Sequence, residues 1–155
     1  MWEVFWHTAG HGVRFAASVS AANISFVWRA EGLKWHIDIL ARRRSRGVCL
    51  SVWELKAPGA YGTPLHQVYI YALTLLKMLR DPELGPKWYE VFGFSGKIPA
   101  SLRIEGVVAV TPDQKSALDD EFATLGTSPR LGMDTIELYA AYYDKDSLEV
   151  AFQKL

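Results

Sequence analysis

Cysteine, net charge and long apolar runs are all scarce in this sequence of 155 residues. Cys49 is the single cysteine, so the chain has no internal disulfide and no cysteine-based zinc site, and we expect a reducing, cytoplasmic compartment. The 17 Lys and Arg balance the 17 Asp and Glu, which removes the simplest electrostatic reason for a nucleic-acid or membrane-surface partner. No apolar run reaches the roughly 18 residues of a membrane span, and we expect no membrane partner.

The remaining composition is that of a compact folded chain. Half of the residues are hydrophobic and 13% are aromatic, which suffices for a sizeable core. We find no internal repeat, low-complexity tract or long linker, so we expect one domain over residues 1–155. Its core is expected at about 13–110, and 111–155 are expected to form a C-terminal helix and hairpin extension.

Hydrophobic patterning and turn residues predict an α/β fold of the α+β kind. The expected strands are 24–30, 33–43, 48–57, 101–110, 135–143 and 147–154. The expected helices are 13–22, 63–80, 87–92 and 112–125. The order is helix, three-strand meander, helix, strand, helix and hairpin, which predicts a mixed central sheet flanked by helices.

The end of the third expected strand carries the candidate chemistry. Glu54 and Lys56 close a strand that is otherwise apolar, where a charge is costly unless it is paired or coordinated. The strand period of two places both side chains on one face. If the preceding hairpin turns around Arg46, Asp38 falls directly opposite Glu54. Two carboxylates and one ammonium group are then expected to converge.

Two converging carboxylates need a cation or a shared proton. At about 4 Å they repel each other by roughly 4 kcal/mol at an effective dielectric of 20. A divalent metal removes this repulsion, and oxygen ligands without cysteine favour Mg²⁺ or Mn²⁺ over zinc. Lys56 beside the metal can orient an attacking water or stabilise charge on a phosphate. The sequence therefore outlines a phosphodiester hydrolase site.

A further motif, Gln67-x-x-x-Tyr71 on the next helix, follows Asp38 and Glu54-Leu55-Lys56. Together these residues resemble the PD-(D/E)XK nuclease superfamily, nearest its RecB-like branch. A Gln-x-x-x-Tyr spacing is expected by chance only about 0.14 times in this composition. The resemblance covers about two thirds of the chain and implies a restriction-endonuclease-like core of order α-β-β-β-α-β. It implies a Mg²⁺-dependent DNA nuclease in which Asp38 and Glu54 bind the metal and Lys56 assists the water. Gln67 and Tyr71 would support the site or contact DNA.

Several other residues admit two interpretations. The basic run of Arg42, Arg43, Arg44 and Arg46 either grips DNA phosphates or is a solvated turn. Three tryptophans either stack on bases or fill the core, namely Trp28, Trp35 and Trp53. His36 is interpreted as an ordinary strand histidine, and nothing places His7 or His11 near the site. A second acid-x-lysine triplet, Asp113-Gln114-Lys115, follows Thr111-Pro112 and is interpreted as the first turn of a helix.

Three functions compete on this sequence. The first is a DNA nuclease, with a homodimer or a partner subunit as further candidate partners. The second is a catalytically inactive nuclease-like domain that binds nucleic acid or assists assembly. It is motivated by a scarcity of acids, because many members of the superfamily carry a further glutamate on the first helix and the only acid before Glu31 is Glu3. The third is a structural domain with no nucleic-acid role, which the zero net charge favours.

Overall fold

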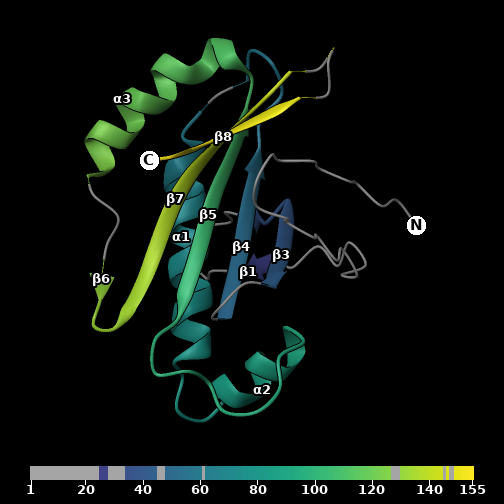
Figure 1. Cartoon of the computed structure of the whole chain (residues 1–155), viewed down its shortest axis with the longest axis vertical. Helices are drawn as coiled ribbons and strands as arrows, with labels where there is room; N and C mark the ends of the chain where they lie inside the picture. The colour runs from purple at the N-terminus through teal and green to yellow at the C-terminus, as the bar shows by residue number, and fades with distance from the viewer. Residues whose placement is uncertain are drawn as a thin grey trace.

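The computed structural model describes residues 25–27, 34–44, 48–60, 62–126, 130–144, 146 and 149–155. Its elements, in chain order, are β1 (Ser25–Val27), β2 (Lys34–His36), β3 (Ile39–Arg44), β4 (Val48–Leu55), α1 (Pro64–Leu79), α2 (Gly85–Val91), β5 (Arg103–Val110), the 3-10 helix η1 (Pro112–Gln114), α3 (Lys115–Leu125), β6 (Arg130–Leu131), β7 (Asp134–Tyr143) and β8 (Val150–Lys154). They form an α+β fold with a mixed sheet (Figure 1). The predicted helix over 13–22 lies outside the described residues. No helix of the described part is long and apolar enough to cross a membrane.

The larger sheet has the strand order β3-β4-β5-β7-β6, and β8 also pairs with β7. β3 and β4 are antiparallel, whereas β4, β5 and β7 run parallel to one another. β8 pairs antiparallel with β7, which confirms the predicted closing hairpin. β6 also pairs antiparallel with β7. The three parallel strands end at the same edge of the sheet, and the chain leaves that edge of β4 to enter α1 (Figure 1).

Two features of the strands differ from the sequence prediction. The expected strand over 33–43 is divided into β2 and β3 at Ile37 and Asp38, and β1 and β2 form a separate two-stranded sheet. The division arises because Ile37 is buried in the core while the Asp38 side chain accepts a hydrogen bond from the backbone of Leu55. The two-residue strand β6 was not expected, and it lies between the expected helix over 112–125 and the expected strand over 135–143.

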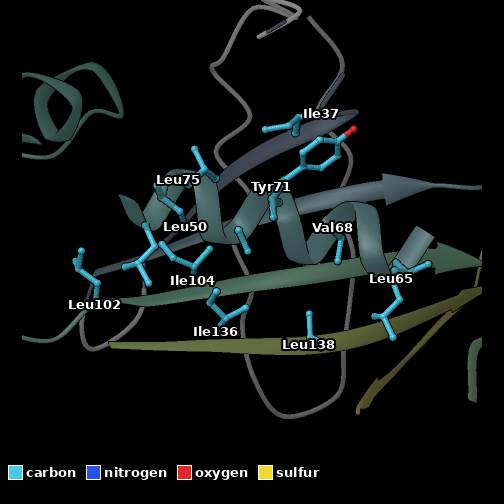
Figure 2. Packing of buried hydrophobic residues seen from close by; sticks show 14 of the residues in the cluster. Ile37, Leu50, Leu65, Val68, Tyr71, Leu75, Leu102, Ile104, Ile136 and Leu138 are labelled. Atoms are coloured by element: carbon cyan, nitrogen blue, oxygen red, sulfur yellow. The ribbon is translucent and has the colours of Figure 1, made fainter. Parts of the chain in front are cut away.

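The main core lies between α1 and one face of the sheet. The helix buries one stripe of side chains, which includes Leu65, Val68, Ala72, Leu76 and Leu79. Figure 2 shows side chains of this helix directed toward side chains of β4, β5 and β7, among them Leu50, Ile104, Ile136 and Leu138. α2 and α3 add the buried Tyr89 and Leu118 to the same cluster. β7, from the segment expected to be an extension, therefore shares the core with β4 and β5.

A glycine sets how closely α1 approaches the sheet. A Cβ atom on Gly106, in β5, would lie 2.9 Å from Val68 Cγ1 and 3.0 Å from Leu138 Cδ2. Both distances are shorter than packed carbon atoms adopt, so the helix reaches its position only because residue 106 has no side chain. This close approach brings the first turns of α1 against the end of β4, where the candidate site lies.

The opposite face of the sheet carries a second, smaller cluster. Val107, Ala109 and Ala141 are buried there, with partly buried aromatic and aliphatic side chains packed against them. Trp53 is one of these and makes an edge-to-face contact with Phe152, with ring centroids 5.7 Å apart. Trp53 therefore serves packing, one of its two predicted interpretations. Trp28 lies outside the described residues.

Candidate active site

The pairing of β3 with β4 places Asp38 beside Glu54. The register runs from Ile39↔Trp53 to Arg44↔Val48, as a hairpin centred on Arg46 predicts. Asp38 directly precedes this ladder, and its Oδ2 accepts a hydrogen bond of 2.8 Å from the backbone N–H of Leu55. The predicted register of the hairpin is therefore confirmed, and Asp38 lies one residue beyond its last pair, Ile39↔Trp53.

Glu54 is a buried carboxylate, and the described part of the chain supplies a partner to only one of its two oxygens. The residue is 6% exposed, and its Oε1 accepts a hydrogen bond of 2.7 Å from Lys56 Nζ. Its Oε2 is buried and has no hydrogen-bond partner among the described residues. Burial raises the pKa of the Glu54 carboxyl, the Lys56 hydrogen bond partly offsets this, and the negative charge of Asp38 raises the pKa further. A cation at this position would favour the ionised form of Glu54.

Lys56 links the strand end to helix α1. Its Nζ donates to Glu54 Oε1 and, at 3.0 Å, to Gln67 Oε1. Gln67 belongs to the first turns of α1, where its backbone N–H bonds the carbonyl of Thr63 as the helix begins. The predicted grouping of Glu54, Lys56 and Gln67 is thus found, with the ammonium group held between two oxygen acceptors.

Tyr71 lies on the same helix but deeper in the molecule. It is 2% exposed and belongs to the main core cluster together with Ile37. In Figure 2 its ring points toward Ile37, the residue next to Asp38. Tyr71 is therefore placed to fix the segment between β2 and β3 that carries Asp38, and its side chain is buried in the core instead of displayed on the surface.

Three residues of the arginine run, Arg42, Arg43 and Arg44, lie at the end of β3 remote from Asp38. Arg42 packs its guanidinium group 5.4 Å from the centroid of the Phe94 ring, and the Gly93 backbone comes close to it. This contact gives Arg42 a structural partner next to α2. The backbones of Arg43 and Arg44 belong to β3, but their side chains are not described, and Arg46 lies outside the described residues.

Two residues that the sequence analysis did not select hold the segment around Lys56. Tyr143 Oη, at the end of β7, donates a hydrogen bond of 2.8 Å to the backbone carbonyl of Lys56. Gln114 Nε2 donates to the carbonyls of Ala57 and Ala60 at 3.3 and 3.4 Å. Gln114 also forms the predicted helix start, through a reciprocal side-chain and backbone cap with Thr111. Both contacts span more than fifty residues of sequence, so no local motif could have indicated them.

Two further polar pairs brace the helices. Glu121 Oε1, from α3, accepts bonds from the backbone N–H and the Nδ1 of His66, at 2.9 and 2.6 Å, near the start of α1. Arg80, just after α1, binds both carboxylate oxygens of Asp134 at 2.6 and 2.8 Å. This pair lowers the pKa of Asp134 and raises that of Arg80. These contacts fix both ends of the helix that presents Gln67.

The donor set suits a hard divalent ion more than zinc. Two carboxylates, Asp38 and Glu54, lie at one strand end, and the described residues contain no group of three or more His, Cys, Asp or Glu placed to hold a metal. Mg²⁺ commonly uses one or two protein carboxylates and completes its shell with water and substrate oxygens. The buried Oε2 of Glu54, which no described residue bonds, is the observation that fits such an ion. Glu3, His7 and His11 lie outside the described residues.

Comparison with known proteins found no relative of this chain. The chain matches no protein-family model, no curated protein and no solved structure. The function is therefore inferred from the side chains gathered at the ends of β4 and α1.

Proposed function

We propose that the chain is a metal-dependent phosphodiester hydrolase that cleaves DNA, with a PD-(D/E)XK type of site. The observation that carries this proposal is the meeting of Asp38, Glu54, Lys56 and Gln67 at one strand end. An antiparallel strand pair followed by a helical crossover to a parallel neighbour, as in β3, β4, α1 and β5, supports a restriction-endonuclease-like core. A protein with these features is expected to bind Mg²⁺ or Mn²⁺.

Each side chain has a role that follows from its position. Asp38 and Glu54 would hold Mg²⁺, which when bound supplies positive charge for the phosphate and lowers the pKa of a water. Lys56 has three N–H donors, of which Glu54 and Gln67 use two. The third is directed by those two contacts and can orient the attacking water or donate to a phosphate oxygen. Gln67 thereby fixes the direction in which the ammonium group acts.

The sharpest test removes a charge and keeps a hydrogen bond. Asp38→Asn preserves an oxygen that can accept from the Leu55 N–H but loses the negative charge. We expect Mn²⁺ affinity, measured by calorimetry, to fall at least about tenfold, which corresponds to about 1.4 kcal/mol. Cleavage of plasmid DNA in Mg²⁺ should fall with it. Asp119→Asn, on the exposed face of α3, is the matched control and should leave both unchanged.

The outcome decides between functions. Lys56→Ala should abolish cleavage at temperatures where circular dichroism shows a folded protein, and equal activity in the variant would remove Lys56 from the mechanism. Unchanged Mn²⁺ affinity in Asp38→Asn would contradict the metal site. An absence of metal binding and cleavage, together with salt-dependent DNA binding, would favour the inactive nucleic-acid-binding domain. The limited set of two carboxylates among the described residues is the observation that keeps this second function in consideration.

A further inference from the structure

The backbone of Lys56 lies at a point where the sheet ladder is interrupted. β4 ends at Leu55, and the next residue still donates from its N–H to the Ala109 carbonyl at 2.9 Å, as in a continuing parallel ladder. The next bond of that ladder would run from the Thr111 N–H to the Lys56 carbonyl, because a parallel residue bonds to both neighbours of its partner. The Thr111 N–H instead donates to Gln114 Oε1 at 3.1 Å. The Lys56 carbonyl thus loses its backbone donor.

Tyr143 supplies the missing donor from two strands away. Its hydroxyl donates to the Lys56 carbonyl at 2.8 Å, although it belongs to β7 and β5 lies between β7 and β4. Ala109 and Ala141 are paired neighbours on the intervening strands, and both are buried in the cluster against which Tyr143 packs. Two small side chains in this row leave room for a tyrosine to reach across β5.

We propose that Tyr143 is a positioning residue for Lys56, so that the C-terminal hairpin completes the site. The hydroxyl fixes the carbonyl of residue 56, and the fixed backbone aims the ammonium group between Glu54 and Gln67. This inference deepens the proposed function and rests on it for its catalytic consequence. A site group displaced by about 1 Å can lose about 100-fold in rate, so loss of one hydroxyl can matter to catalysis without unfolding the protein.

The test compares two tyrosines of the same sheet face. Tyr143→Phe removes the hydroxyl that bonds Lys56, whereas Tyr139→Phe removes a hydroxyl that bonds Glu137 at 3.1 Å. Both variants lose one partly buried hydrogen bond and keep the ring. Nuclear magnetic resonance on the metal-free protein measures the rate at which the Nζ protons of Lys56 exchange with water. Exchange should become at least about tenfold faster in Tyr143→Phe and stay unchanged in Tyr139→Phe.

The readouts separate this inference from the proposed function. Unchanged exchange of the Lys56 Nζ protons in Tyr143→Phe overturns the positioning role, whether or not the protein cleaves DNA. If the wild type cleaves, Tyr143→Phe should lower kcat about tenfold at unchanged KM, and an unchanged kcat also overturns the inference. A wild type that does not cleave counts against the nuclease proposal alone, and the exchange measurement then decides the role of Tyr143.

Discussion

Replacing Lys56 by methionine is expected to expose the cost of the buried Glu54 carboxylate. Methionine has a similar length and removes only the ammonium group that bonds Glu54 Oε1 at 2.7 Å. Breaking a fully buried ion pair from one side costs about 3–5 kcal/mol. The Lys56 side chain is 19% exposed and Glu54 is 8% exposed at its side chain, so water compensates in part. We therefore expect a loss of about 2–3 kcal/mol in the free energy of unfolding at pH 8.

The loss should depend on pH in one direction. Burial and Asp38 already raise the pKa of Glu54 above 4.5, and removing Lys56 removes the contributions that lower it. A carboxyl whose folded pKa lies above its unfolded pKa costs nothing while both states are protonated. The penalty grows as the pH rises from the unfolded pKa to the folded pKa, by about 1.4 kcal/mol for each unit between them. Lys56→Met should thus be nearly as stable as the wild type near pH 4.5 and less stable at pH 8.

Urea unfolding at the two pH values measures this difference. Lys115→Met is the control, because its pair with Asp119 is exposed and should contribute no measurable stability. Adding Glu54→Gln to Lys56→Met should restore most of the loss at pH 8, since the buried charge is then gone. An equal loss at both pH values, or a double variant as unstable as the single one, would refute the account of Glu54 as a desolvated carboxylate that Lys56 stabilises.

Three further predictions follow from the packing. Gly106→Val places carbon atoms within about 3 Å of side chains on α1 and β7. Thermal unfolding should show that the free energy of unfolding falls by about 1–3 kcal/mol. An unchanged free energy of unfolding would contradict the close approach of α1 to the sheet. Arg80→Lys breaks the bidentate bond to Asp134 and should cost about 2 kcal/mol in urea unfolding. Because that bond lowers the pKa of Asp134, the cost should decrease as the pH falls from 3.8 and be lost below the lower folded pKa; a cost that does not decrease in acid would contradict this account. Burial and then Glu137 raise the pKa of Tyr139 to about 12, so ultraviolet titration should show a late-titrating phenol whose signal Tyr139→Phe removes.

Local patterns in the sequence determined much of this protein. The period of two, the turn around Arg46 and the apolar course of β4 were enough to place Asp38 at the Glu54 end of the strand, because hairpin register follows from turn position. The helix expected over 63–80 agrees closely with α1, which spans Pro64–Leu79. The sequence could therefore predict that Asp38, Glu54 and Lys56 converge, whereas Gln67 entered the site only through the resemblance to the nuclease superfamily.

Only the tertiary structure decided how that group is held. The break at Ile37 and Asp38 depends on a bond to Leu55 from another strand, and the insertion of β7 beside β5 brings Tyr143 to a carbonyl 87 residues earlier. The physical reason is that side-chain periodicity fixes which face of an element is buried, whereas strand order and the filling of the space between strands depend on the whole core at once. The strand order β4-β5-β7 is a property of that shared packing. So is the pairing of the two small residues Ala109 and Ala141 on neighbouring strands.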